Sequence, residues 1–202
     1  ERGQFADIKP YFWQTDTAIA LNSWGYTEHN DFRPAEDIIC DLVDIVSKNG
    51  CLLLNVGPKP DGTITQEDKA VLLKIGAWLK TNGEAIYGSR VWRRYGEGPT
   101  QVVDGQFSDS IKKNFTSRDF RFTTADGYLY AIAMKCSGDG EYWIRSLGIQ
   151  DASRQANFHG IIRDVEVLGC GEKPQWSRDQ EGLHIRSGFV GDGPVVFKLE
   201  LE

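Results

Sequence analysis

The sequence predicts an α/β half over residues 1–95, followed by an all-β half over residues 96–202 that forms an antiparallel β-sandwich. Strand and helix patterns alternate up to about residue 92, which is typical of an α/β fold. Helical periodicity then stops, and short alternating segments bounded by turns replace it. We expect the boundary near Tyr95-Gly96. Hydrophobic residues make up 40% and charged residues 26% of the 202-residue chain, a composition that argues against wholesale disorder.

The first half opens with a predicted strand, helix and second strand. Residues 11–15 form an aromatic and β-branched run that predicts a strand. Pro34 occupies the first turn of a helix whose apolar residues recur at helical spacing until Asn49-Gly50 ends it. Residues 51–56 are apolar at successive positions, which predicts a strand buried on both faces.

A second helix is expected over residues 66–80, after the turn cluster at residues 58–62. Thr65 is the predicted N-cap, and acidic residues follow it in the first turn. The predicted buried face consists of Val71, Leu72, Ile75, Trp78 and Leu79. These elements are too few to close an eight-stranded barrel, which takes about 250 residues. We therefore expect further strands upstream, beside the apolar edge of the strand at residues 51–56.

The second half contains a predicted β-hairpin. Residues 120–124 and 128–133 flank Asp126-Gly127, a dipeptide that suits a type I′ turn. Further strands are expected at residues 160–163, 165–168, 183–186 and 195–201. Short strands at this spacing predict two antiparallel sheets packed as a sandwich.

Composition and motif content exclude several classes of function. The net charge of −6 argues against a dedicated nucleic-acid-binding protein, because phosphate contacts require a basic surface. No apolar stretch approaches the roughly 20 residues of a membrane-spanning helix. The cysteines form no CxxC pair, so the sequence predicts no zinc site. Cys40 and Cys51 are expected as buried thiols. A disulfide between Cys136 and Cys170 is an alternative that the sequence does not decide.

Five sequence blocks in the first half carry the most specific signal. They are Phe12-Trp13-Gln14-Thr15-Asp16, Ser23-Trp24-Gly25-Tyr26, residues 53–64, Ile75-Gly76-Ala77-Trp78-Leu79 and Asn82-Gly83-Glu84-Ala85-Ile86-Tyr87-Gly88-Ser89. In this order and spacing they resemble the C-terminal part of the retaining α-L-fucosidases, glycoside hydrolase family 29. The resemblance covers residues 1–92 strongly, whereas the β-rich remainder matches the family only in its layout.

The resemblance implies the C-terminal part of a TIM-like (β/α) barrel followed by a β-sandwich. It also implies hydrolysis of terminal α-linked L-fucose from oligosaccharides or glycoconjugates, with retention of configuration and with no metal or organic cofactor. Two carboxyl groups about 5 Å apart perform such a reaction, one as nucleophile and one as acid/base. The family leads us to expect a periplasmic or secreted protein. The chain starts without Met, and we expect it to be a fragment that is inactive alone.

The same resemblance assigns roles to individual residues. The nucleophilic Asp is expected upstream of this chain. Glu1 falls at the acid/base position, with Asp7 as the nearest competitor. Trp24 corresponds to the aromatic residue that packs against the fucose and its C6 methyl group. Trp13 and Gln14 are expected behind the site, without direct contact to the sugar.

Two other interpretations remain open. The β-sandwich could be a non-catalytic carbohydrate-binding module, which would make the second half the functional part of the chain. It could instead be a structural domain that only supports the barrel. Asn55 interrupts an apolar strand, and a buried Asn must be hydrogen-bonded, so we expect it to have a supporting role. The sequence predicts no oligomeric state.

Overall fold

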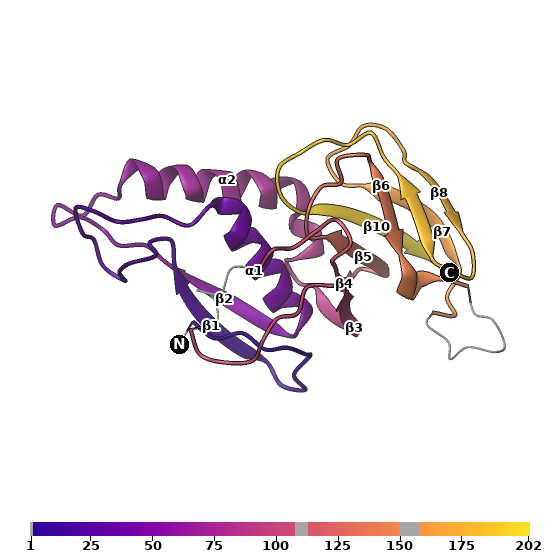
Figure 1. Cartoon of the computed structure of the whole chain (residues 1–202), viewed down its shortest axis with the longest axis horizontal. Helices are drawn as coiled ribbons and strands as arrows, with labels where there is room; N and C mark the ends of the chain where they lie inside the picture. The colour runs from indigo at the N-terminus through magenta and orange to yellow at the C-terminus, as the bar shows by residue number, and fades with distance from the viewer. Residues whose placement is uncertain (1, 108–112, 150–157) are drawn as a thin grey trace.

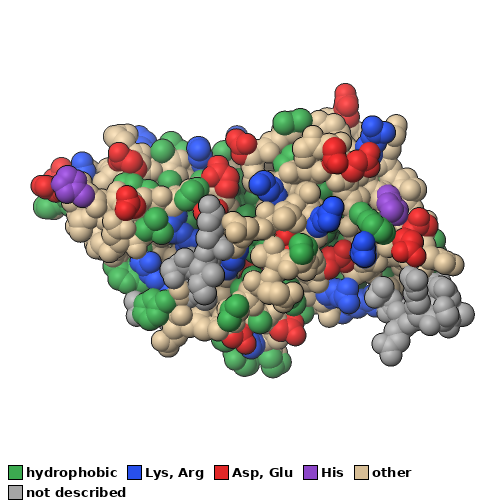
Figure 2. All heavy atoms as spheres, viewed as in Figure 1, with side chains coloured by type: hydrophobic (Ala, Val, Ile, Leu, Met, Phe, Trp, Pro, Cys, Tyr) green, Lys and Arg blue, Asp and Glu red, His purple; other side chains and the backbone are tan. Residues whose placement is uncertain are grey.

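The computed structural model describes residues 2–107, 113–149 and 158–202. Two helices and a short parallel sheet form the first half, and two antiparallel sheets form the second (Figure 1). On the face shown in Figure 2, acidic and basic side chains are interspersed over both halves. The net charge is therefore not concentrated at one place on that face. Among the described residues, no helix is both long enough and apolar enough to cross a membrane.

The first half is a βαβ unit. Strand β1 (Trp13–Ala18) pairs in parallel with β2 (Gly50–Asn55), and helix α1 (Ala35–Ser47) connects them. The predicted strand, helix and strand are thus confirmed. The expectation that the second strand is buried on both faces is wrong, because Leu53 is 55% exposed. Among the described residues β2 pairs only with β1, and the side chain of Leu53 is more than half exposed.

Helix α2 (Gln66–Asn82) follows and continues into a short 3₁₀ turn, η1 (Gly83–Ala85). The predicted N-cap is confirmed, since the Thr65 hydroxyl accepts a hydrogen bond from the Asp68 amide at 3.0 Å. Of the predicted apolar stripe only Ile75 is fully buried, and the other members are half-buried. The indole of Trp78 donates to the Pro194 carbonyl at 2.9 Å. This bond attaches α2 to the second half of the chain.

The second half contains two antiparallel sheets. The larger has the order β3-β4-β5-β10-β7, and the smaller has the order β6-β9-β8. Their strands are β3 (Arg90–Glu97), β4 (Phe120–Ala125), β5 (Tyr128–Ala133), β6 (Glu141–Ile144), β7 (Ile162–Val167), β8 (Gln175–Arg178), β9 (Leu183–Arg186) and β10 (Val195–Leu201). The hairpin β4–β5 is confirmed: Asp126 and Gly127 have φ values of 50° and 84°, and a type I′ turn needs positive φ at both positions.

Two details of the predicted β half differ from the structure. The strands expected at residues 160–163 and 165–168 are a single strand, β7, because Asp164 continues the ladder opposite Glu200. A half-buried acidic residue is tolerated there because β7 is the outermost strand of its sheet. Strands β3, β6 and β8 were not predicted. Charged residues break the alternation of β3, and β6 and β8 contain only four residues each.

Two apolar clusters organise the packing. The first lies between the two antiparallel sheets, with Phe122 and Phe197 from one sheet against Tyr142 and Ile185 from the other. The second joins the halves of the chain. It combines Ile38 of α1 with residues of α2, β5 and β10. Strand β3 also runs across the expected boundary at Tyr95-Gly96 and pairs with β4. The two halves therefore share a core and several hydrogen bonds.

All four cysteines are free thiols. The disulfide that the sequence allowed between Cys136 and Cys170 is therefore not formed. Cys40 donates to the Met134 carbonyl at 3.4 Å. Burial, together with the charges of Asp41 and Asp37, raises the pKa of the Cys40 thiol to about 12. This cysteine is consequently unreactive at neutral pH.

Candidate functional site

The carboxyl ends of β1 and β2 bring two loops together around Trp24. The Asn55 side chain, at the end of β2, donates through Nδ2 to the Trp24 carbonyl at 2.6 Å. A side chain at Gly57 would approach the carbonyl carbon of Gly25 to 2.7 Å, so only glycine fits between the loops. The expected hydrogen-bonded role of Asn55 is confirmed. In barrel enzymes the carboxyl ends of the strands form the active-site face.

The ring of half-buried Trp24 contacts the start of the described chain. The guanidinium carbon of Arg2 lies 4.3 Å from the Trp24 ring centroid, a cation–π contact. The Arg2 amide donates to Asp16 Oδ1 of β1 at 2.9 Å. Arg2 has a φ of 48°, in the left-handed region that non-glycine residues seldom adopt. Glu1, the predicted acid/base residue, lies outside the described residues.

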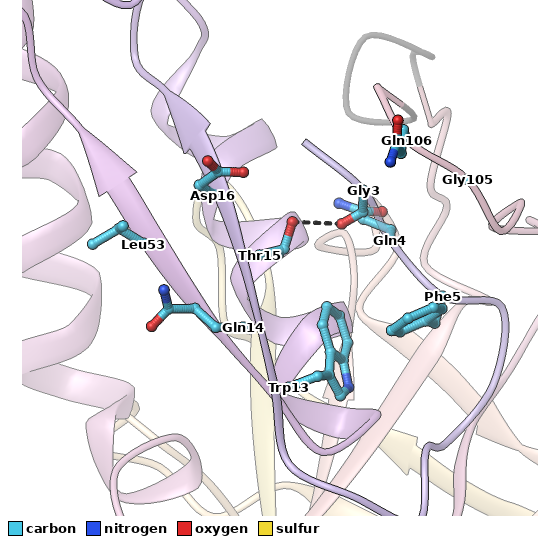
Figure 3. A pocket seen from close by; sticks show the side chains of 10 residues that line it. All are labelled: Gly3, Gln4, Phe5, Trp13, Gln14, Thr15, Asp16, Leu53, Gly105 and Gln106. Atoms are coloured by element: carbon cyan, nitrogen blue, oxygen red, sulfur yellow. Dashed lines mark hydrogen bonds between the residues drawn. The ribbon is translucent and has the colours of Figure 1, made fainter. Parts of the chain in front are cut away.

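A cavity of about 680 Å³ lies along β1 beside this contact. Its walls come from the N-terminal segment, from β1, from Leu53 of β2 and from residues 105–106 of the second half (Figure 3). The Thr15 hydroxyl points toward the N-terminal segment and donates to the Gly3 carbonyl at 2.6 Å. Gln14 also lines the cavity. The cavity is open to solvent, so it can admit a polar ligand.

Trp13 forms a rigid part of this wall. Its ring packs edge-to-face on Phe5, with 4.8 Å between the ring centroids. Its Nε1 donates to the carbonyl of Lys48 at 2.9 Å. The ring fills the space above Gly50, where a β-carbon would lie 2.5 Å from Trp13 Cζ2. Trp13 is only 9% exposed, so its indole shapes the cavity and has little surface left for stacking.

A segment of the second half reaches the cavity from outside the βαβ unit. Residues 99–107, called here the connecting segment, follow β3 and run to the N-terminal segment (Figure 1). Gln4 and Gly105 exchange two backbone hydrogen bonds of 3.2 Å each, and the Asp104 carboxylate accepts a hydrogen bond from the Ala6 amide. The connecting segment could not be predicted, because it has no periodic pattern and its partners are about a hundred positions away.

A buried ion network lies beneath the Trp13 wall. Asp44 of α1 is fully buried and contacts Lys48 Nζ at 2.7 Å and Arg121 Nε of β4 at 2.5 Å. Burial alone would raise the pKa of Asp44, but the charges of Arg121 and Lys48 outweigh it and lower that pKa. Burial lowers the pKa of Lys48 to about 8. Because the Lys48 carbonyl also holds Trp13, this network links the β half to the cavity wall.

The described residues contain no group of three or more His, Cys, Asp or Glu side chains placed to hold a metal ion. The Asp16 carboxylate accepts a hydrogen bond from the Arg2 amide, and the Arg2 side chain contacts the Trp24 ring. Trp24 and Asp16 thus meet at Arg2, the residue that follows Glu1 in sequence.

Comparison with known proteins identifies the family. The model of the family described as alpha-L-fucosidase matches residues 1–84. Plasma alpha-L-fucosidase of Rattus norvegicus is 39% identical over 194 residues, which cover 93% of this chain and 35% of the relative. The human plasma enzyme is 31% identical over 182 residues, covering 88% and 34% respectively. The chain belongs to the α-L-fucosidase family.

The solved structures agree with this assignment. The crystal structure of Thermotoga maritima α-fucosidase in complex with fucose superposes with a TM-score of 0.71 at 28% sequence identity. The match covers 96% of this chain and 40% of the Thermotoga chain. The mixed α/β and antiparallel β architecture thus matches part of a fucosidase fold. The chain spans about a third of the length of the curated relatives it matches.

Proposed function

We propose that the protein containing this chain is a retaining exo-α-L-fucosidase, which removes terminal α-L-fucose from oligosaccharides or glycoconjugates. The observation that carries the proposal is the placement of Trp24. The Asn55 side chain holds the backbone of Trp24 at the carboxyl ends of two parallel strands. The ring of Trp24 contacts Arg2, the residue after Glu1. Family membership supplies the reaction class. In this proposal the chain contributes the last strands of a (β/α) barrel and the β-sandwich that follows it.

In the proposed reaction an Asp outside this chain attacks C1 of the fucose. The carboxyl group of Glu1 gives its proton to the glycosidic oxygen as the bond from C1 to that oxygen breaks. The resulting glycosyl-enzyme is hydrolysed by a water molecule that Glu1 deprotonates, which releases fucose with retained configuration. Trp24 packs against the apolar C6 methyl group of the sugar.

The comparisons do not favour a non-catalytic carbohydrate-binding function, since the relatives named above are all described as fucosidases. A purely supporting β-sandwich is compatible with fucosidase activity. We also propose a periplasmic or secreted location, because fucosylated glycans occur outside the cytoplasm.

The decisive experiment compares Glu1→Gln with Asp7→Asn in the full-length protein. Asp7 is the nearest competing carboxylate, and its side chain is exposed. Glu1→Gln is expected to lower turnover of an aryl α-L-fucoside by about 10²–10⁴-fold, the usual contribution of acid–base catalysis. Azide, a nucleophile that needs no base, should restore turnover of an activated fucoside and yield a fucosyl azide.

Asp7→Asn should leave turnover unchanged. A variant pattern in which Asp7→Asn is inactive and Glu1→Gln is active would assign the acid/base role to Asp7. A wild-type protein that binds fucosides but releases no fucose would refute the enzymatic proposal. NMR detection of the first-formed anomer tests retention: β-L-fucose as the initial product would contradict it.

A further inference from the structure

The N-terminal segment, Arg2 to Ala6, is held on the side of β1 by two side chains. Asp16 Oδ1 accepts the Arg2 amide at 2.9 Å, and the Thr15 hydroxyl donates to the Gly3 carbonyl at 2.6 Å. Both groups come from one regular strand that is paired along its length with β2. They fix the first backbone groups after Glu1 relative to the βαβ unit.

The connecting segment holds the opposite side of the same backbone. Gln4 and Gly105 form an antiparallel pair through two reciprocal hydrogen bonds of 3.2 Å. The Asp104 carboxylate accepts a hydrogen bond from the Ala6 amide. The two backbones lie so close that a β-carbon on Gly3 would be 3.0 Å from the Gly105 carbonyl oxygen. Figure 3 shows Gly3 and Gln4 between β1 and residues 105–106. The segment after Glu1 is therefore clamped from both sides.

The connecting segment is itself anchored in the β half. Asp119 is fully buried and accepts hydrogen bonds from the amide and the hydroxyl of Thr100, at 2.8 and 2.9 Å. The same carboxylate accepts bonds from the amide and hydroxyl of Thr116. Val102 is 6% exposed and belongs to the core shared by both halves. A rigid base thus supports an exposed tip that carries Asp104 and Gly105.

We propose that the connecting segment is a positioning element for the acid/base residue, with Asp104 and Gly105 as its positioning residues. This inference rests on the proposed role of Glu1. Proton transfer to the leaving oxygen requires the carboxyl group within hydrogen-bond reach, and displacements of about 1 Å can cost up to a hundredfold in rate. The β half therefore takes part in catalysis by holding backbone that is contiguous with Glu1, without touching the substrate.

The test uses the full-length protein and two substrates that differ in their need for an acid. The leaving group of 2-chloro-4-nitrophenyl α-L-fucoside departs without protonation, whereas that of phenyl α-L-fucoside needs a proton. Asp104→Ala is expected to lower kcat/KM on the phenyl substrate roughly ten- to a hundredfold and to change it less than about threefold on the activated one. Asp104→Asn keeps a carbonyl oxygen that accepts the Ala6 amide and should restore near wild-type values.

Two further variants make the result specific. Val103→Ala alters an exposed side chain in the same segment and should affect neither substrate. Thr15→Val removes the hydroxyl that bonds the Gly3 carbonyl, and it should show the same leaving-group dependence as Asp104→Ala. Thr15→Ser keeps the hydroxyl and should behave like the wild type. Equal losses on both substrates for Asp104→Ala, or no loss at all, would overturn the positioning role.

Glu1→Gln, measured in parallel, separates this inference from the proposed function. If Glu1→Gln shows the leaving-group dependence and Asp104→Ala does not, only the positioning role is refuted. If Glu1→Gln reacts equally poorly with both substrates, acid catalysis by Glu1 is refuted and the positioning role with it.

Discussion

The side-chain amide of Asn55 donates a hydrogen bond of 2.6 Å to the backbone carbonyl of Trp24. This bond joins the end of β2 to the loop that follows β1, so that one strand fixes the backbone of Trp24, for which we propose a contact with the sugar. The loops are packed so closely at Gly57 that no side chain fits between them. Trp24 is thereby positioned by backbone restraints that do not involve its own ring.

Replacement of Asn55 by Asp is expected to weaken substrate binding. The variant keeps the size of the side chain, loses the donor and sets a carboxylate against the Trp24 carbonyl. Loss of one partner of such a bond costs about 1–3 kcal/mol, which corresponds to a KM for an aryl fucoside raised by roughly 5- to 150-fold. The same substitution at Asn114, whose side chain is exposed, serves as control. An unchanged KM for Asn55→Asp would show that the loop holds Trp24 without this bond.

Removal of Asp44 should strongly destabilise the protein. Asp44→Ala leaves the charges of Lys48 and Arg121 buried without a counter-ion, at a cost of about 3–5 kcal/mol. Chemical denaturation measures the free energy of unfolding. The control is Glu36→Ala, which removes an exposed ion pair of 3.8 Å with Lys74 and should cost less than about 1 kcal/mol. Similar losses for the two variants would contradict the importance of the buried network.

The stabilisation provided by Asp44 should disappear in acid. Its pKa in the folded protein lies below the ordinary value of 3.8. A carboxyl group with a lowered pKa stabilises the fold fully above its unfolded-state pKa and loses that effect as pH falls through the folded-state pKa. The difference in melting temperature between wild type and Asp44→Asn should therefore be constant above about pH 5 and shrink below about pH 4. A difference that stays constant down to pH 2 would contradict the lowered pKa.

Two glycine-to-alanine substitutions should have opposite effects on stability. A β-carbon at Gly50 would lie 2.8 Å from Ile45 Cγ2 and still closer to the Trp13 ring, so overpacking should cost about 1–3 kcal/mol. Gly76 lies on the exposed face of α2, where a β-carbon would meet no described atom within 4 Å outside the helix backbone, and alanine there should stabilise by about 0.5–1 kcal/mol. Thermal melts of both variants test this. A destabilised Gly76→Ala or an unaffected Gly50→Ala would contradict the packing described.

The helices and the central hairpin were predictable because their signals are local. The apolar spacing after Pro34, the cap at Thr65 and the Asp126-Gly127 turn depend on neighbours a few residues away. The burial of β2 was predicted incorrectly, because burial depends on what packs against a strand and not on its own composition. The proposed role of Trp24 comes from the family resemblance, and its position next to Arg2 could not be inferred from spacing.

The sequence by itself determined the class of each half, the main elements and the family, because periodicity, turn chemistry and motif order are properties of the chain. Only the tertiary structure decided that Asp44, Lys48 and Arg121 form one buried network and that Asp104 reaches Ala6. These contacts join residues up to about a hundred positions apart. They form only once both halves have packed together, because the charged side chains of Asp104 and Arg121 each pair with a partner from the other half of the chain.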